Sequence, residues 1–290
     1  MMILEEPEWR ERAASHESQV DAWINPHLDR RRRGIAHPVW DFMFDYYTLS
    51  PAKLRRWHPG AGVLLTGDVR EFARMRGYVV DESGARIDES AIDARVIDSI
   101  VALLQATAQR DAAFGCFGRH EWAMVYRLAQ DDVRHSSWPL RLDPDSIAEV
   151  VESAPLRCTH FDAFRFYTAA AAPLNTIQPT RATQIELEQP GCLHATMDLY
   201  KWAYRTYPVL GADIVADAFA LARDVRAVDM QASPYDLADL GFAPIRIETA
   251  DGRSEYVQRQ RDFAERGQEL RYRIIDVLKA QAGVHPLPAP

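Results

Sequence analysis

The sequence predicts a mainly α fold, a single helical domain with small β-hairpin or short-strand pieces. Apolar residues recur at helical spacing in several segments, most clearly in the stripe from Ile92 to Leu104, whereas period-two alternation is confined to short stretches. No internal repeat or low-complexity linker divides the chain. We therefore expect an N-terminal helical arm over residues 1–36, a main helical domain over 37–282 and a disordered tail over 283–290.

Turn and capping residues set the expected boundaries in the first third of the chain. Ser50-Pro51 is typical of an N-cap followed by proline in the first helical turn, and Ser90 with Asp93 has capping-box spacing. The expected elements, in order, are a polar helix over 7–33 with a break at Pro26, a helix in the aromatic segment HPVWDFMFDYY, a short helix from Pro51 that ends at His58-Pro59-Gly60, a hairpin over 77–87 that turns at Glu82-Ser83-Gly84, and a helix that follows Ser90 and runs through Leu104.

The rest of the chain is also expected to be mostly helical. Asp143 and Asp213 are typical N-caps, and Thr183 with Glu186 forms another capping-box pair. The expected elements are a helix in HEWAMVYRLA after the loop at 115–118, a short helix from Asp143, a strand or buried extended segment over 155–167, a helix over 192–206, a helix over IVADAFALARDVRAVDM, a strand with an Asp251-Gly252 turn within 244–256, and a long polar helix over about 254–281.

The charge balance and the cysteine usage limit the class of protein. A net charge of -8 disfavours DNA as a partner, because non-specific DNA binding needs a broad positive surface. Three widely spaced cysteines without a CxxC pair are typical of a reducing compartment. The first residues lack the pattern of a signal peptide, and no apolar run reaches the ~18 residues of a membrane span. We expect a cytoplasmic protein with no membrane partner.

The segment 192–201 contains the most informative candidate site. On a helix, His194 and Asp198 lie one turn apart on one face, and Lys201 follows three residues later. Asp198 could orient His194 and fix its tautomer, or it could be a general base whose pKa Lys201 tunes. Mostly apolar neighbours indicate a buried helix, in which charged groups need partners. The alternative is a surface hydrogen bond and an ion pair.

His120 and Glu121 form a second candidate pair at the start of a predicted helix. A neutral histidine and a carboxylate there could bind a metal or move a proton. Adjacent helix positions diverge, however, so the two side chains are not expected to aim cleanly at one small ligand. The alternative is that Glu121 complements the helix dipole.

A third candidate group lies in the segment CTHFDAF. If this segment is extended, Cys158, His160 and Asp162 share one face and form a ligand or catalytic row. The alternative is a core histidine in an aromatic segment.

The histidines of these three groups could converge on a metal. His120, His160 and His194 belong to separate elements, and three protein ligands with an open position are the pattern of a catalytic metal. Zn, Fe or haem are the candidate groups, with His58 as a reserve ligand. The sequence contains no HExxH, CxxC pair or facial-triad spacing. It also lacks a Walker loop, GxGxxG and GxSxG, which argues against nucleotide-binding folds and α/β-hydrolases.

Aromatic residues close to these groups could line a pocket for a cofactor or a substrate ring. Trp122, Tyr126 and Tyr200 are the candidates. Aromatic residues at helical spacing usually belong to a core, so we expect only one or two of them to line a ligand.

Several motifs within residues 37–260 carry a family resemblance: HPVWDFMFDYY, LRRWHPG, FGCFGRHEWAMVYR, CTHFDAFRFYT, NTIQPTR, EQPGCLHATMDLYKWAY and DMQASPYDLADLG. Together they resemble a group of bacterial proteins labelled 3-methyladenine DNA glycosylase. The resemblance implies a DNA-repair hydrolase that cleaves the N-glycosidic bond of an alkylated base after flipping it out of the duplex. Asp198, Glu121 or Asp162 could then activate water or stabilise the sugar cation.

One further fragment bears on the glycosylase hypothesis. Pro59-Gly60-Ala61-Gly62 resembles the hairpin whose amides hold a DNA phosphate in helix-hairpin-helix glycosylases. The residues that follow it, VLLTGD, do not predict a helix.

Three hypotheses about function stay open at this point. The first is a base-excision DNA glycosylase whose carboxylate is Asp198 or Glu121. The second is a metal- or haem-dependent enzyme that acts on a small molecule through the histidines. The third is a non-catalytic helical protein that binds a ligand.

Overall fold

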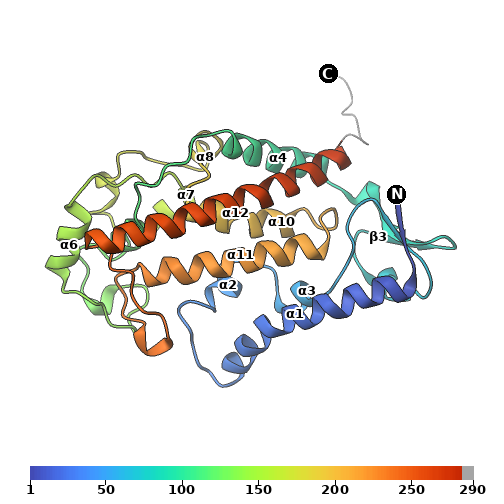
Figure 1. The fold of residues 1–290 in the computed structure, drawn as a ribbon, viewed down its shortest axis with the longest axis horizontal. Coiled ribbons are helices and arrows are strands. Elements are labelled where there is room, and N and C mark those ends of the chain that lie inside the picture. The colour runs from blue at the N-terminus through green and yellow to red at the C-terminus, as the bar shows by residue number, and fades with distance from the viewer. Residues whose placement is uncertain (283–290) are drawn as a thin grey trace. The chain divides into compact units, whose positions relative to one another are not determined.

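The computed structural model describes residues 1–282 and confirms a mainly helical fold (Figure 1). The tail expected at 283–290 lies outside the described residues. The described residues form two compact units: unit 1 contains residues 1–104, 199–220 and 270–282, and unit 2 contains residues 105–198 and 221–269. None of the described helices combines the length and the apolar character of a membrane span.

Unit 1 combines helices with a small sheet. Its elements, or the parts of them that belong to it, are β1 (Met2–Leu4), α1 (Glu6–Arg32), α2 (Phe42–Asp45), α3 (Pro51–Arg55), β2 (Val63–Leu65), a 3₁₀ turn (Arg70–Arg74), β3 (Tyr78–Asp81), β4 (Gly84–Ile87), a 3₁₀ turn (Glu89–Ala91), α4 (Ala94–Ala108), α10 (Leu199–Arg205), α11 (Ala212–Gln231) and α12 (Ala250–Ala282). The last parts of α4 and α11 and the first part of α12 belong to unit 2.

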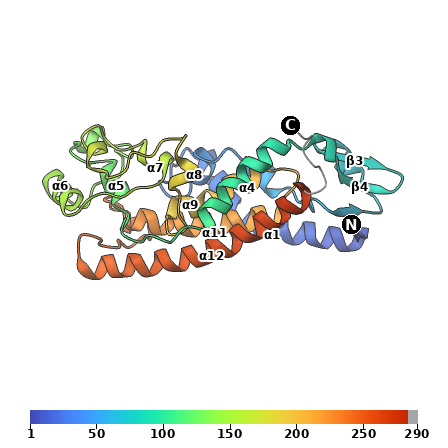
Figure 2. The same ribbon diagram turned by 90° about the horizontal axis from the view of Figure 1, so that it is seen from above.

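The sheet of unit 1 has the strand order β1-β2-β4-β3. The hairpin expected over 77–87 is confirmed: β3 and β4 lie next to each other (Figure 2) and pair antiparallel, with Tyr78 opposite Ile87. β1 pairs in parallel with β2, which places Ile3 opposite Leu64. One face of this sheet packs on a buried apolar cluster in which Trp9 meets Phe72 edge-on, with ring centroids 5.6 Å apart.

Unit 2 contains short helices and the facing parts of two long ones. Its remaining elements are α5 (Arg119–Ala123), a 3₁₀ turn (Gln130–Asp132), α6 (Pro144–Glu152), α7 (Phe161–Phe164), a 3₁₀ turn (Ala172–Leu174), α8 (Gln184–Leu187), α9 (Leu193–Met197) and a 3₁₀ turn (Ala238–Leu240). α11 and α12 lie side by side (Figure 1), and an ion pair between Asp224 and Arg266 joins them at 2.6 Å.

Local capping signals predicted several helix starts correctly. Ser50 accepts a hydrogen bond from the Lys53 amide at the start of α3, and Asp143 caps α6 through two backbone amides. The helix expected from the Ser90 capping box begins later, at Ala94, because Asp93 accepts a hydrogen bond from the Arg95 amide and takes the capping role.

Several other helix boundaries differ from those expected from the sequence. The break expected at Pro26 is wrong, because α1 continues to Arg32 with Ile24 and His27 buried on either side of the proline. Of the aromatic segment HPVWDFMFDYY, only α2 is a regular α-helix. The helix expected over 192–206 is divided into α9 and α10 at Asp198.

The strand expected within 244–256 is also wrong. α12 begins at Ala250 and includes Asp251-Gly252, the pair expected to form a turn. The hydroxyl of Thr249 accepts a hydrogen bond from the Gly252 amide and so starts the helix. Glycine is needed at 252 because a Cβ there would lie 1.9 Å from the carbonyl oxygen of Arg246.

Candidate metal centre

Four metal-ligand side chains converge in the interior of unit 2. His120 and Glu121 come from α5, His194 from α9 and Asp229 from α11, and one ligand atom of each lies within 4.8 Å of the others. Asp229 is completely buried, and His120 and Glu121 are buried as well. His194 is the partly exposed member of the set. We call these four residues the His/acid cluster.

The position of α5 depends on a left-handed residue at its start. Gly118 has φ 71° as the N-cap of α5, and a Cβ on it would lie 3.1 Å from the ring of Tyr256 in α12. This close approach brings α5 against α12 and points His120 toward α11. The divergence of adjacent helix positions predicted that His120 and Glu121 would not aim cleanly at one small ligand, and this prediction is wrong: the longer Glu121 side chain reaches the same cluster.

Hydrogen bonds hold the cluster together. Nε2 of His120 lies 2.8 Å from Oδ1 of Asp229, and its Nδ1 lies 3.4 Å from Sγ of Cys116. Nη1 of Arg226 donates to Glu121 and to Asp229, at 3.3 Å in each case. The buried carboxylates of Glu121 and Asp229 therefore share the guanidinium of Arg226. His120 has a partner on each of its ring nitrogens.

Burial and charge shift the pKa values of these groups in opposite directions. Burial alone would lower the pKa of His120, but the Asp229 carboxylate and Cys116 outweigh it and raise that pKa well above the usual value. Burial would raise the pKa of Asp229, but His120 and Arg226 hold it well below its usual range. These opposite shifts favour an ion pair between the His120 imidazolium and the Asp229 carboxylate.

The other two members have pKa shifts dominated by burial. Burial, followed by repulsion from Asp229, raises the pKa of Glu121. Burial, followed by repulsion from His120, lowers the pKa of His194 well below its usual value. His194 is therefore a neutral imidazole at neutral pH, the form that binds metals.

A second histidine with two carboxylates adjoins the cluster. Nδ1 of His160 accepts a hydrogen bond from the Ala163 amide at 3.3 Å, so the ring proton sits on Nε2. Nε2 lies 3.4 Å from Oε1 of Glu188 and 3.3 Å from Oδ2 of Asp198. The His160 side chain is 1% exposed and both carboxylate side chains are 2% exposed, so this proton is held inside the protein.

The three histidines selected from the sequence lie in a row of contacting rings. His194 meets His120 edge-on, with centroids 4.6 Å apart, and stacks on His160 at 5.4 Å. His160 is nevertheless not part of the set of four possible metal ligands, which consists of His120, Glu121, His194 and Asp229.

The remaining candidate carboxylates and Lys201 have other surroundings. Asp162 forms an ion pair with Arg165 at 3.0 Å. The expectation that Cys158, His160 and Asp162 share one face of an extended segment is wrong, because α7 begins at Phe161 and His160 serves as its N-cap. Lys201 belongs to unit 1, where its ammonium lies 4.6 Å from the centroid of the Trp202 ring.

The aromatic candidates and the reserve ligand lie in the protein interior. Trp122 is completely buried and donates to the Ala232 carbonyl at 2.8 Å, and the Tyr126 hydroxyl donates to Glu152. Tyr200 packs edge-on against Tyr47 in unit 1. His58 also lies in unit 1.

The structure adds residues that sequence reasoning missed. Asp229 and Arg226 stand three positions apart on α11, a spacing that resembles an ordinary surface ion pair. The available signal was the apolar stripe of IVADAFALARDVRAVDM, on which both charges are buried. Glu188 had no such signal, because it follows a four-residue helix in a polar segment.

Two imidazoles and two carboxylates form a donor set that suits divalent zinc, iron or manganese. A haem takes only one or two axial ligands from the protein, so four converging side chains favour a bare ion over haem. No protein-family model, curated protein or solved structure matches the chain.

Proposed function

We propose that the protein is a metal-dependent enzyme that acts on a small molecule at the His/acid cluster. The observation that carries the proposal is the convergence of four ligand atoms within 4.8 Å, supplied by three helices and buried from solvent on most sides.

The residues fit a divalent cation. His194 is neutral and its lone pair can bind a metal directly, whereas His120 exchanges a proton for the metal. The carboxylates of Glu121 and Asp229 supply negative charge that Arg226 only partly balances. Cys116, at 3.4 Å from Nδ1 of His120, orients the ring from behind, as outer partners of metal-binding histidines do.

When bound, such a metal would polarise a water molecule or a substrate oxygen. The chain's own residues supply the remaining functions. Arg226 fixes the two carboxylates in place, and the partly exposed His194 marks the side from which a small molecule can approach. His160 stacks on His194, and its Nε2 lies between the carboxylates of Glu188 and Asp198, so it helps to hold the His194 ring in place.

Metal analysis of the native protein tests this proposal. Protein purified without chelator is assayed for zinc, iron and manganese, and we expect about one ion per chain, as for a mononuclear site. Stripping the metal should lower the melting temperature, and restoring it should reverse the loss. His194→Ala and Glu121→Gln should each weaken metal binding by at least tenfold, a loss expected even for outer partners.

A histidine outside the cluster provides the matched control. His135 is also in unit 2, but its ring packs on Tyr235 at 5.4 Å. His135→Gln should keep the full metal content. The proposal fails if no ion copurifies and added metal leaves the melting temperature unchanged, or if His135→Gln loses as much metal as His194→Ala.

A base-excision assay separates this proposal from the glycosylase hypothesis. On an alkylated duplex, a small-molecule enzyme should release no base with or without metal. Release that disappears in Asp198→Asn or Glu121→Gln would instead favour a glycosylase. The loop at Pro59 weighs against phosphate binding there, because it leads into β2 and its Ala61 amide already donates to the Val209 carbonyl.

A further inference from the structure

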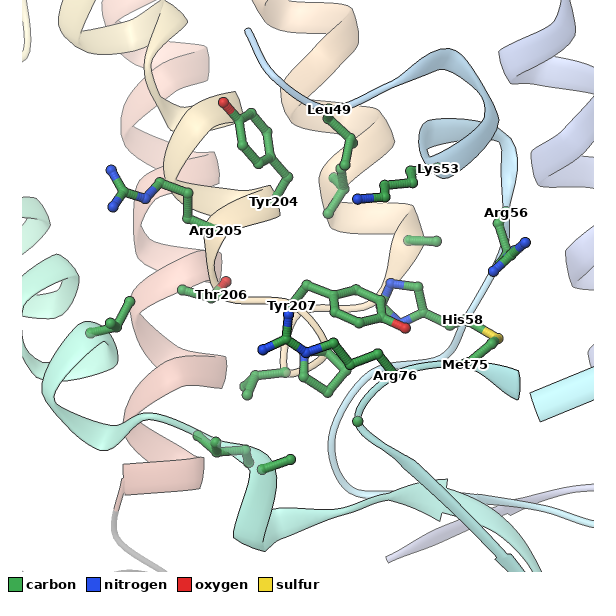
Figure 3. A pocket seen from close by; sticks show the side chains of 18 of the residues that line it. Leu49, Lys53, Arg56, His58, Met75, Arg76, Tyr204, Arg205, Thr206 and Tyr207 are labelled. Carbon is green, nitrogen blue, oxygen red and sulfur yellow. The ribbon is translucent and has the colours of Figure 1, made fainter. Parts of the chain in front are cut away.

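Unit 1 contains a pocket that the proposed metal chemistry does not use (Figure 3). Its volume is about 610 Å³, which falls within the range of small-molecule sites. The walls come from the ends of α3 and α10, the loop before β3, the first turn of α4 and the loop before α11. Every lining residue belongs to unit 1.

The pocket is strongly cationic. Five basic side chains line it, against a single carboxylate, that of Asp93; they are Lys53, Arg56, Arg74, Arg76 and Arg205. The whole chain, by contrast, has a net charge of -8. A local excess of this size in an acidic protein indicates a ligand of the opposite sign.

The five cations of the pocket are not used in ion pairs within the described part of the chain. Among residues 1–282, none of the five forms an ion pair with a carboxylate, whereas the neighbouring Arg55 pairs with Glu17 at 2.9 Å and with Asp21 at 2.7 Å. Asp93, the carboxylate of the pocket, faces Arg95 at 3.7 Å and caps α4. The positive charge is thus left for a ligand to neutralise.

His58 and Tyr207 also line the pocket, and Tyr78 contacts His58 from outside the lining. The hydroxyl of Tyr78 accepts a hydrogen bond from the Gly60 amide and lies 3.2 Å from Nδ1 of His58, which fixes the orientation of the His58 ring. The ring of Tyr207 lies edge-on to His58 at 4.8 Å and is among the exposed large side chains.

Figure 3 shows Tyr207 over His58, with Arg76 beside the tyrosine ring and Lys53 and Arg56 on the side of α3. Arg56 and Arg76 both lie close enough to Tyr207 to lower the pKa of its hydroxyl, against the larger effect of burial, which raises it. A flat, exposed ring thus adjoins at least two unpaired guanidinium groups.

We propose that this pocket binds a small phosphorylated molecule that also carries a planar ring. Guanidinium groups match phosphate oxygens in a two-pronged geometry, and several of them together favour a ligand with more than one negative charge. In this arrangement Lys53, Arg56 and Arg76 hold the phosphates, and Tyr207 supplies the surface for the ring. The inference does not depend on the metal centre, because its residues are all in unit 1.

Calorimetric titration of the full chain tests the proposal with three probes: ADP, pyrophosphate and adenosine. We expect ADP to bind more tightly than pyrophosphate, and adenosine to bind least. The affinity for ADP should fall as the salt concentration rises, since the interaction is between charges. Arg56→Gln combined with Arg76→Gln should weaken ADP binding by at least tenfold, since each substitution removes charged hydrogen bonds to the phosphates.

Two further variants make the assignment specific. Tyr207→Ala should weaken ADP binding and leave pyrophosphate binding unchanged. The control is Arg12→Gln, which removes an exposed arginine of α1 that pairs with Glu8 and should not alter binding of either probe.

Several results would overturn the proposal. One is the absence of ADP binding at millimolar concentration; another is equal ADP binding by the wild type and the doubly substituted variant. Equal affinity for ADP and pyrophosphate would remove the role of the ring. Tight binding of a DNA duplex that ADP does not displace would show that the cations serve a macromolecule instead.

Discussion

Removal of the Asp229 charge should strongly destabilise unit 2. The Asp229 side chain is completely buried and contacts Nε2 of His120 at 2.8 Å and Nη1 of Arg226 at 3.3 Å. Asp229→Asn preserves the shape of the side chain but leaves two buried cations that share only Glu121. Loss of one partner of a buried ion pair costs about 3–5 kcal/mol, and because asparagine still accepts a hydrogen bond we expect a loss near ~3 kcal/mol.

Urea unfolding in the presence of a chelator measures this effect without any contribution from metal. The midpoint should fall while the slope with denaturant stays the same. The matched control is Asp224→Asn, because Asp224 stands on the same helix but pairs with Arg266 at the surface; an exposed pair contributes about 0–1 kcal/mol. Ordinary surface substitutions change the unfolding free energy by about ±0.5 kcal/mol. If the unfolding free energy of Asp229→Asn differs from that of the wild type by no more than this, the reasoning about the buried network is refuted.

Three further predictions concern single residues. Burial, followed by repulsion from His16, lowers the pKa of His58 to about 3. Below about pH 6.5, the ordinary pKa of histidine, the unfolded chain therefore binds a proton at His58 that the folded chain does not bind. At pH 5 the wild type should have lost about 2 kcal/mol of its unfolding free energy for this reason, whereas His58→Gln should show no such loss. Equal pH dependence of the two proteins would contradict this. Gly118→Ala should cost about 1–3 kcal/mol, because alanine must adopt φ 71° against the Tyr256 ring; thermal unfolding checks it, and an unchanged melting temperature would argue against the placement of α5. Asp143→Ala should cost about 1 kcal/mol through loss of the α6 cap, whereas a cost of zero in denaturant unfolding would exclude that capping role.

Elements with local signals could be predicted from the sequence. The hairpin at 77–87 needs only its own turn and alternation, and the starts of α3 and α6 need only Ser50 and Asp143 with the amides that follow. The strands β1 and β2 were missed because each has three residues and they pair across about sixty positions of sequence. Periodicity cannot detect so short and distant a pairing.

The candidate site was predictable to a similar degree. Histidines beside carboxylates in apolar surroundings identified His120, Glu121 and His194, because buried polar groups need partners. Asp229 was missed because its partner His120 lies more than a hundred residues away, and only the packing of α5 on α11 brings them together. Asp198 was expected to orient the neighbouring His194, and the structure also places its carboxylate 3.3 Å from Nε2 of His160, a contact between separate segments that the sequence pattern could not show.

Anomalous diffraction from crystals of the metal-loaded protein tests the central claim most directly. Data collected on both sides of the absorption edge of the bound metal should give one strong peak in unit 2, about 2.0–2.2 Å from nitrogen atoms of His120 and His194 and from a carboxylate oxygen of Asp229 or Glu121. Crystals of the loaded protein that show no peak there, with Nε2 of His120 still bonded to Asp229, would contradict it.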